Sequence, residues 1–446
     1  MKRFILSLAL LLPATLPAQN NLTLEECRDL AIKNNKELRI SNERVKIAEY
    51  EKKSAITKYF PQLSATGAYL WNEKDIYLLD ATKLGPLATA VPPTLLEELR
   101  LDIQNIWIGN ISLVQPVFMG GKIVSYNQIA KYSKLLAESM NDQTLQEIIY
   151  KTDETYWQVV SLVNKKKLAD SYVDLLRRME SDVAHLVKEG LATKTDELTV
   201  RVKLNEAEMA QTKVDNGLSL SRMLLSQICG LSLDEPISLY DESLEDLQIN
   251  QGNTIADINE AFINRSELRS LDYVTKIYKE KESLVLSDML PNLALTANYL
   301  ATSPNSFNGF NHDFKGMFNV GVAMQIPLSG WWEGSFKRNA ARAETHIKKL
   351  ETEDAREKIE LQVNQSVYKV NEAKKKLIAS TQNKESAEEN LKYADYGFKE
   401  GVIPSLNLME AQTAWVSAHS DFIDAQIEMK LSEVYLSKAL GKLAVE

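Results

Sequence analysis

The sequence holds few of the residues that build metal and redox sites. It has two cysteines and four histidines among 446 residues. The histidines are scattered, without a carboxylate or cysteine at ligand spacing, so no metal site is predicted. Cys27 and Cys229 lie far apart within helical patterns and are not repeated in the other half of the chain. An exported protein could pair them, but the pattern favours two small buried side chains.

Long apolar runs and an excess of positive charge are also missing. After residue 18, no stretch is apolar for the roughly 20 residues that a membrane-spanning helix needs. Only helices and closed barrels satisfy their backbone groups in lipid, so this chain could enter a membrane only as strands. The formal net charge of −9 argues against a nucleic-acid partner.

No arrangement typical of catalysis is present. The sequence offers no nucleophile–base pair and no converging pair of acids, so no catalytic residue and no cofactor is predicted. The GGK segment at 120–122 lacks the spacing of a phosphate-binding loop. The sequence therefore predicts a protein that is not an enzyme.

The first 18 residues have the pattern of a secretory signal peptide. Lys2 and Arg3 precede a short apolar segment, and the small residue Ala18 ends the pattern. We expect this segment to be removed on export. Cys27 lies well beyond the apolar segment and follows two glutamates, so no lipid on the amino terminus is expected.

The rest of the chain repeats itself. PQL at 61–63 returns as PNL at 291–293, an offset of 230, and EG at 189–190 returns as EG at 400–401, an offset of 211. The chain therefore contains two copies of one structural unit, and the first copy carries 19 extra residues that indicate a surface loop. The predicted boundaries are a first repeat at 19–230 with a hairpin tip at about 189–195, a linker at 231–252, and a second repeat at 253–446 with a hairpin tip at about 400–405.

Each copy contains two segments in which apolar and polar residues alternate, as in strands with one apolar face. The predicted strands lie at about 62–71, 106–116, 292–301 and 317–327. Each has about ten residues, the length of a tilted strand that crosses a bilayer. The predicted helix–strand transitions lie at Pro61, Pro116, Pro291 and Pro327.

Four strands are too few to close a membrane barrel, because the smallest barrels have about eight. If these strands lie in a membrane, several chains must share one barrel. An ordinary sandwich, or two hairpins on a soluble core, is the alternative that the strand pattern leaves open.

Long segments without helix breakers separate the strand pairs. No glycine or proline lies between Gly121 and Gly190, and a helix of about 69 residues would be on the order of 100 Å long. The second copy has a matching segment from about 335 to 400. Such lengths imply coiled-coil packing. The predicted seam of the first hairpin consists of Tyr172, Leu176, Met179, Val183 and Leu186, continued by Leu198, Val202, Asn205 and Met209.

Each long helix is predicted to turn back at a glycine. Gly190 and Gly401 fit the left-handed position that ends a helix. Thr195 and Ser405 are the predicted N-caps of the return helices. An unbroken helix is also predicted from Thr23 to about Tyr59, because the segment contains no glycine or proline.

Taken together, these motifs resemble the TolC family of bacterial outer-membrane efflux and secretion channels. The resemblance rests on LTLEE at 22–26, FPQL at 60–63, QPVFMGG at 115–121, and Gly190 followed six residues later by Asp196. It covers essentially the whole chain after the signal segment, in order and in both copies.

The resemblance implies a mostly helical fold with membrane strands. Three chains would each give four strands to one twelve-stranded β-barrel, and their coiled-coil hairpins would form a tunnel (an α-barrel) across the periplasm. The implied partners of this homotrimer are a periplasmic adaptor, an inner-membrane transporter and outer-membrane lipid. The implied function is a passive conduit of a tripartite efflux or type I secretion system, opened at its periplasmic end.

The resemblance also implies roles for residues at the tips. Asp196 matches the tip aspartate of the first hairpin, Asn407 stands where the second hairpin usually has an aspartate, and Glu410 matches the acid one turn on. These three residues are the implied periplasmic gate. The implied adaptor contacts are Gly190, Leu191, Gly401 and Val402.

Two positions depart from the family pattern. Ile403 stands where some members have a tying arginine, and Phe398 where they have a tyrosine. The resemblance therefore implies weaker or different polar ties at the closed end.

Two alternatives remain open from the sequence. One is a soluble periplasmic coiled-coil scaffold, in which the strand pairs form a small cap and not a barrel. The other keeps the fold but makes the chain a channel dedicated to secreting one protein. The sequence does not separate drug efflux from protein secretion.

Overall fold

The computed structural model of the chain describes residues 21–77, 92, 94, 100–101, 103–234, 237–243, 254–305, 307 and 313–443. The predicted signal segment, residues 1–18, lies outside the described residues, and so does part of the predicted linker at 231–252. Among the described residues, no helix combines the length and the hydropathy of a transmembrane span.

The chain forms two compact units, each assembled from both repeats. The helical unit comprises Met1–Arg44, Glu138–Ser270 and Glu353–Glu446, and the strand unit comprises Val45–Ala137 and Leu271–Thr352. Two long helices, α4 (Lys122–Lys188) and α8 (Gly330–Lys399), contribute residues to both units.

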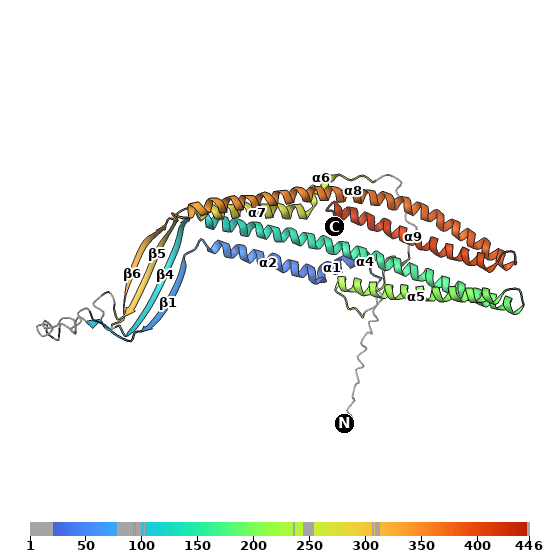
Figure 1. Ribbon diagram of the computed structural model, residues 1–446, viewed down its shortest axis with the longest axis horizontal. Coiled ribbons are helices and arrows are strands. Elements are labelled where there is room, and N and C mark those ends of the chain that lie inside the picture. Colours follow the sequence, from blue (N-terminus) through green and yellow to red (C-terminus); the bar gives the residue numbers. More distant parts are fainter. Residues whose placement is uncertain are drawn as a thin grey trace, which may run out of the picture. The chain divides into compact units, whose positions relative to one another are not determined.

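The strand unit contains one antiparallel four-stranded sheet in the order β1-β4-β5-β6 (Figure 1). The strands are β1 (Gln62–Trp71), β4 (Asn105–Met119), β5 (Asn292–Ser303) and β6 (Lys315–Gln325). The pairing of β4 with β5 joins the strand pair of the first repeat to that of the second. Two short strands, β2 (Ile76–Tyr77) and β3 (Arg100–Leu101), form a separate ladder.

Helices also pair within the strand unit. α2 (Lys36–Thr57) lies beside the first part of α4, where the Asn127 side chain donates a hydrogen bond to the Ala55 carbonyl at 3.0 Å. α7 (Ser266–Ser287) lies beside the first part of α8, where Arg342 donates to Glu282 at 2.8 Å. The two repeats therefore build equivalent helix pairs.

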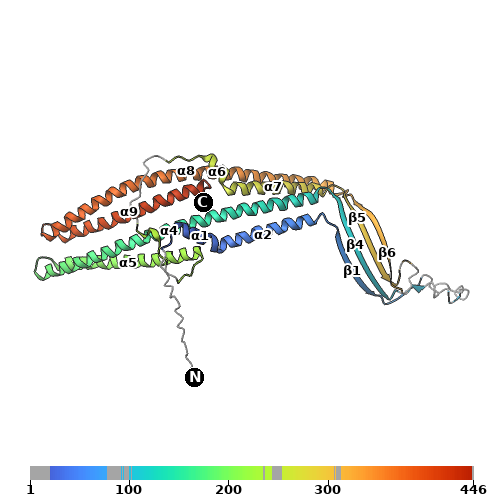
Figure 2. The ribbon, with the colours of Figure 1, turned by 180° about the vertical axis from the view of Figure 1, so that it is seen from behind.

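The helical unit is built on two helical hairpins. α4 turns back into α5 (Lys194–Cys229), and α8 turns back into α9 (Ser405–Ala439), with each return helix beside its partner in both views (Figures 1 and 2). Shorter elements complete it: α1 (Leu24–Asn34), the 3-10 turn η3 (Tyr240–Glu242) and α6 (Ile258–Asn264). α4 has 67 residues and α8 has 70, which confirms the two predicted long helices.

The prediction of one unbroken helix after Thr23 is wrong. α1 ends at Asn34, Asn35 adopts an extended backbone, and α2 begins at Lys36. The break is local and polar: the Asn35 side-chain oxygen accepts hydrogen bonds from the backbone N–H groups of Glu37 at 2.9 Å and Leu38 at 3.4 Å. Asn35 thus caps α2 without a glycine or proline.

The core of the first hairpin follows only part of the predicted seam. Leu176, Met179 and Val183 on α4 are buried, as predicted. On α5 the prediction is wrong, because Leu198, Val202 and Met209 are exposed in the single chain. The buried α5 residues are Val200, Leu204 and Ala207. Two apolar stripes alternate on this helix, and packing against α4 selects the second.

Candidate functional site: the sheet, the hairpin tips and the helix junctions

One face of the sheet is apolar across all four strands. The register places Leu63 opposite Leu113, Ala65 opposite Ile111 and Tyr69 opposite Trp107. The same face continues onto β5 and β6 with Ala297, Tyr299, Phe318, Val320 and Val322. The two edge strands, β1 and β6, are exposed along their entire length. A strand face of this composition suits contact with lipid.

The opposite face carries a polar row. Ser64, Ser112, Asn298 and Asn319 are aligned across the four strands by the register. The Asn298 amide donates to the Asn319 side-chain oxygen at 3.1 Å. The alternation therefore separates an apolar face from a face that can contact water.

Both edges of the four-stranded sheet are open in the single chain. Within the part of the chain that the structure describes, β1 pairs only with β4, and β6 pairs only with β5. Each edge therefore presents a row of backbone N–H and C=O groups without a strand partner. Such groups are costly in lipid unless another strand pairs with them.

The prolines predicted at the helix–strand transitions differ in their surroundings. Pro61 and Pro291 immediately precede β1 and β5, and Pro327 lies two residues after β6. Pro116 lies inside β4, where the register with β5 shifts before Phe118. This shift is expected because proline has no N–H to donate to the ladder.

The first hairpin tip is a compact turn. Gly190 has a left-handed backbone (φ 75°), and the Leu191 N–H donates to the Leu186 carbonyl at 2.8 Å. α5 then begins at Lys194 with Thr193 as its N-cap, so the predicted N-cap at Thr195 is wrong. Thr193 and Asp196, the first and last residues of the TKTD sequence at 193–196, form a capping box.

Asp196 takes part in this cap. Its carboxylate accepts hydrogen bonds from the Thr193 hydroxyl at 2.7 Å and from the Thr193 N–H at 2.9 Å. The bond from the Thr193 hydroxyl, and to a smaller extent the bond from the Thr193 N–H, lower the pKa of the Asp196 carboxyl below its ordinary value. The tip aspartate therefore stays charged in more acidic solution than an isolated aspartate.

A second carboxylate lies next to Asp196. Glu197 forms ion pairs with Lys194 at 2.6 Å and with Arg201 at 3.3 Å. Arg201 also reaches Glu180 on α4 at 3.0 Å. The Lys194 ion pair lowers the pKa of Glu197. This network ties the two helices of the first hairpin just behind the tip.

The second tip has the same turn but another cap. Gly401 is left-handed (φ 71°), and the Val402 N–H donates to the Gly397 carbonyl at 2.8 Å. α9 begins at Ser405 with Pro404 at the N-cap position and no side-chain capping bond, so the predicted N-cap at Ser405 is wrong. Proline is tolerated there because the N–H of the N-cap residue takes no part in the hydrogen bonds within the helix.

The predicted gate and adaptor residues occupy both tips. Leu191 and Val402 are exposed by 76% and 77%, beside the tip glycines. Asn407 and Glu410 are exposed on the first turns of α9. Phe398 and Ile403 pack against a buried cluster that includes Met179, Val183, Val200, Leu408 and Met409. Apolar packing at these positions therefore joins the two hairpins of one chain.

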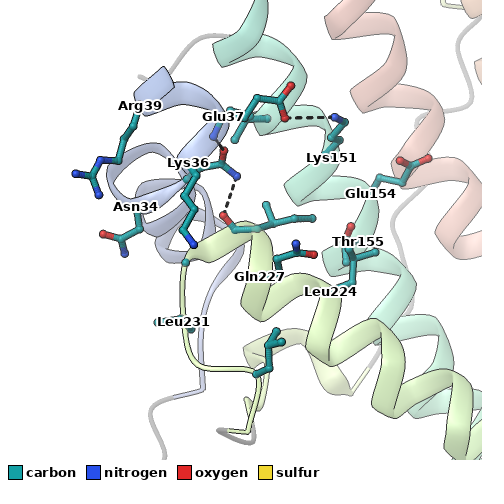
Figure 3. Close-up of a pocket in the computed structure, with 15 residues that line it drawn as sticks. Asn34, Lys36, Glu37, Arg39, Lys151, Glu154, Thr155, Leu224, Gln227 and Leu231 are labelled. Atoms are coloured by element: carbon teal, nitrogen blue, oxygen red, sulfur yellow. Dashed lines mark hydrogen bonds and ion pairs between the residues drawn. The ribbon is translucent and has the colours of Figure 1, made fainter. Parts of the chain in front are cut away.

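The junction between α1 and α2 closes the far end of the first hairpin (Figure 3). Asn34 donates its amide to the Cys229 carbonyl at 3.2 Å. Asn35 donates its amide to the Ile228 carbonyl at 3.1 Å. These carbonyls belong to the last turn of α5, which has no further helical N–H groups to bind. The junction borders an open cleft of about 950 Å³.

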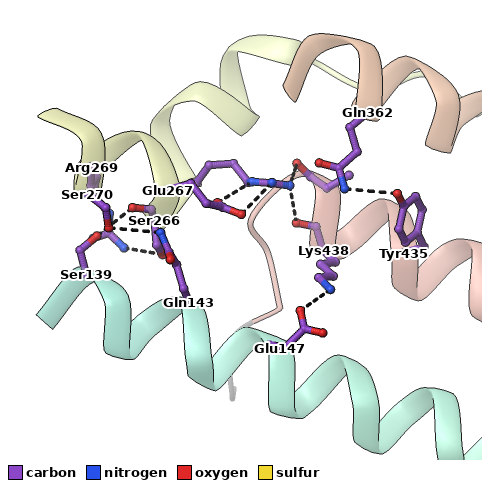
Figure 4. Close-up of polar contacts among 12 residues, drawn as sticks. Ser139, Gln143, Glu147, Ser266, Glu267, Arg269, Ser270, Gln362, Tyr435 and Lys438 are labelled. Atoms are coloured by element: carbon purple, nitrogen blue, oxygen red, sulfur yellow. Dashed lines mark hydrogen bonds and ion pairs between the residues drawn. The ribbon is translucent and has the colours of Figure 1, made fainter. Parts of the chain in front are cut away.

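In the second repeat, a charged side chain binds the last carbonyls of the return helix α9 (Figure 4). Arg265 lies between α6 and α7 and donates to the Lys438 and Ala439 carbonyls at 3.4 and 3.2 Å. Glu267 holds the guanidinium from the other side with two bonds of 2.8 Å. Sequence reasoning missed both junctions, although the pair Asn34 and Asn264 repeats at the offset of 230.

These features agree with a family match that covers most of the chain. A model described as "Outer membrane efflux protein" matches residues 27–231 and 240–442, one match for each repeat. The chain therefore belongs to the outer membrane efflux protein family, the TolC family of channels. It is an outer-membrane efflux channel and not an enzyme. No curated protein matches it by sequence.

Solved structures share the fold at low identity. The outer-membrane channel OprN is 16% identical with a TM-score of 0.77, over 94% of this chain and 90% of that one. VceC from Vibrio cholerae is 14% identical with a TM-score of 0.74, over 94% and 96%. The Campylobacter jejuni CmeC channel is 13% identical with a TM-score of 0.75, over 94% and 85%. These likenesses confirm the predicted fold class.

Proposed function

We propose that three copies of this chain form one channel with a shared twelve-stranded β-barrel. The observation that carries the proposal is the sheet itself: its two open edges and its continuous apolar face both need partners that one chain does not supply. Pairing β1 of one copy with β6 of the next would satisfy both rows of backbone groups. The helices also need partners, because apolar residues on α5, including Leu198 and Val202, are exposed in the single chain and would be buried against a neighbouring copy.

The channel would act as the passive conduit of a tripartite efflux or type I secretion system. The exposed tips around Leu191 and Val402 would contact a periplasmic adaptor, which links the channel to an inner-membrane transporter. Energy would come from that transporter, and the sequence of this chain contains no recognisable nucleotide-binding motif. Opening would occur as the hairpins separate at their tips.

The carboxylates at the tips would give the channel its ion preference. Asp196 and Glu410 from three chains would place six negative charges near the periplasmic end, which favours cations. Asn407 stands where the family usually has an aspartate, so this channel would prefer cations less strongly than a channel with an aspartate at that position. Apolar contacts at Phe398 and Ile403 would take part in holding the tip closed.

Planar bilayers test this proposal directly. Asp196→Asn combined with Glu410→Gln should reduce the preference for cations, measured as the reversal potential in a salt gradient. Asparagine keeps an acceptor for the Thr193 cap, so the tip should still fold. Asn407→Asp is the matched opposite change and should raise cation preference. Reversal potentials that stay the same in both variants would contradict the assignment of the gate.

A paired substitution on β6 tests the two faces of the sheet. Val320→Asp places a charge on the apolar face, whereas Asn319→Asp places it on the polar face of the same strand. A charge that faces lipid near the bilayer centre is destabilising, by about 2 to 4 kcal/mol for Arg or Lys and by less for Asp. The first variant should therefore be depleted from outer-membrane fractions, and the second should accumulate like the parent. Equal recovery would favour the soluble scaffold, which family membership otherwise disfavours.

A further inference from the structure

Cys27 and Cys229 lie next to each other in the helical unit. Cys27 is on α1 and Cys229 is the last residue of α5, and both side chains are fully buried. The Cys229 thiol donates a hydrogen bond to the Cys27 carbonyl oxygen at 3.5 Å. Both are free thiols in the structure. Two cysteines separated by 202 positions thus lie in one buried cluster, with the sulfur of Cys229 against the backbone of Cys27.

Polar contacts fix α1 on both sides of Cys27. Before it, Thr23 and Glu26 form a capping box, and the Leu22 N–H donates to the Ser238 carbonyl at 2.9 Å. After it, Arg28 makes a two-pronged ion pair with the buried Asp153, at 2.7 and 2.6 Å. The position of Cys27 against α5 is therefore set by contacts that do not involve sulfur.

Apolar packing surrounds the two thiols. The cluster that contains them also contains Tyr156, Val160 and Leu225, all fully buried. The hydrogen bond to Cys229, together with burial, raises the pKa of the Cys27 thiol. A thiol in such a place is a poor nucleophile once the protein has folded, because the thiolate is the reacting species.

We propose that Cys27 and Cys229 form a disulfide bond in the exported protein. An outer-membrane protein passes through the periplasm, an oxidising compartment in which disulfides form and persist. The oxidant would be a protein disulfide of that compartment. One cysteine attacks it as a thiolate to give a mixed disulfide, and the other displaces the oxidant, which leaves as a dithiol after taking two electrons and two protons from the cysteine pair.

The bond must form before α1 packs against α5. Neither sulfur is accessible in the folded chain, so a protein oxidant can reach the cysteines only during folding. For the same reason, reductants should not open the bond in the folded protein. Burial therefore makes the bond a permanent structural link and not a reversible redox switch.

The link would act on the first repeat alone. The repeat offsets place Asp257 at the position of Cys27 and Leu440 at the position of Cys229, so the second repeat cannot form it. The base of the first hairpin would be tied covalently to α1, whereas Arg265 holds the base of the second hairpin by hydrogen bonds. The two hairpins would thus differ in how freely their bases can move.

Thiol counting on the full chain tests this inference. Protein in an outer-membrane fraction is precipitated in acid to stop exchange, dissolved in denaturant, and treated with a polyethylene-glycol maleimide with or without prior reduction. We expect no added label without reduction and two labels after it. Two labels without reduction would overturn the proposal.

Single-cysteine variants provide the control. Cys27→Ser and Cys229→Ser should each take one label under both conditions, because the remaining thiol has lost its partner. A single variant that takes no label without reduction would show that its cysteine pairs elsewhere, which would also overturn the proposal. A parent sample that is exposed to a reductant while folded, and freed of the reductant before denaturation, should still take no label. Since the readout is covalent, it does not depend on channel activity or on the number of chains.

Discussion

Asn35 and Arg265 occupy equivalent positions in the two repeats and bind equivalent carbonyls. The Asn35 amide lies 3.1 Å from the Ile228 carbonyl oxygen, and the Arg265 guanidinium lies 3.2 Å from that of Ala439. Each side chain stands at a helix break and satisfies the last turn of a return helix. One repeat uses a neutral donor and the other a charged donor that Glu267 holds in place.

The two junctions should therefore respond differently to alanine. Arg265→Ala should cost about 2 to 3 kcal/mol, because hydrogen bonds from charged groups are stronger and the carbonyls are buried. Asn35→Ala should cost about 1 to 2 kcal/mol for the loss of a neutral bond and a cap. Thermal unfolding of the detergent-solubilised protein measures both.

Arg269 is the matched control for Arg265. It lies on α7 with a half-exposed side chain and pairs with Asp142 at 3.0 Å. Arg269→Ala should cost less than about 1 kcal/mol, as for other surface pairs. If Arg269→Ala destabilised the protein as much as Arg265→Ala, the capping of α9 would not explain the effect.

Because Arg28 pairs with the buried Asp153, we expect Arg28→Ala to lose folding stability by an amount that depends on pH. Burial raises the pKa of Asp153 even though Arg28 opposes the shift. Arg28→Ala should cost about 3 kcal/mol at pH 7, because it leaves a buried carboxylate without its partner. An acid whose pKa is raised by folding binds more protons in the folded state, so the defect should shrink as the pH falls towards the pKa of the folded state.

Denaturation of Arg28→Ala at pH 7 and pH 5 checks this expectation, with the parent at both values. Arg28→Met combined with Asp153→Leu removes both charges and should recover most of the lost stability. A defect that is constant with pH, or a double variant no better than Arg28→Ala, would mean that the buried charge is not the cause.

The tip glycines should tolerate alanine only at the cost of backbone strain. Gly190 and Gly401 have left-handed backbones and open space around the position of a β-carbon. Each change to alanine should cost about 1 kcal/mol. Gly217, inside α5, is the control, because a β-carbon there would make only ordinary contacts with Leu162. Gly217→Ala should stabilise by up to about 1 kcal/mol, and a loss at Gly217 would contradict the helix argument.

The Thr193 cap should control when the proposed gate loses its charge. Its hydrogen bonds lower the pKa of Asp196, and the charged form is lost as the pH falls through that lowered value. Thr193→Ala removes the hydroxyl donor, so cation preference should then disappear at a higher pH than in the parent. The measurement is the reversal potential in planar bilayers as the pH is lowered from 7 to 3.

Thr199 is the control for this titration. Its hydroxyl donates to the Thr195 carbonyl one turn back and does not bind Asp196. Thr199→Ala should therefore titrate like the parent channel. Identical titration of all three proteins would mean that Asp196 does not set the ion preference.

The strands and hairpin turns were readable from the sequence because their signals are local. Alternation with a period of two identifies one face of a strand, as in Leu63, Ala65 and Tyr69, whatever that face contacts. Glycine at 190 and 401 has a backbone requirement that few other residues meet. The fold class followed from such signals, from the internal repeat and from the resemblance to the TolC family that these motifs carry.

The helix breaks were not readable in this way. Asn35 and Arg265 are not strong helix breakers. The cap that Asn35 gives α2 is local, but the carbonyls that the two side chains bind lie 193 and 174 residues away in the chain. The buried face of α5 was ambiguous for a related reason, since its two apolar stripes fit a heptad equally well. The cap at Thr193 was missed in favour of Thr195, although a threonine followed three residues later by an acid is a capping-box pattern that the sequence contains.

The mass of the native protein tests the central claim most directly. The protein would be extracted from an outer-membrane fraction in mild detergent and measured by light scattering, with the detergent contribution subtracted. We predict three protomers in each particle, as required for open β1 and β6 edges that pair between copies. A monomer or dimer that remains in solution without detergent would contradict the shared barrel.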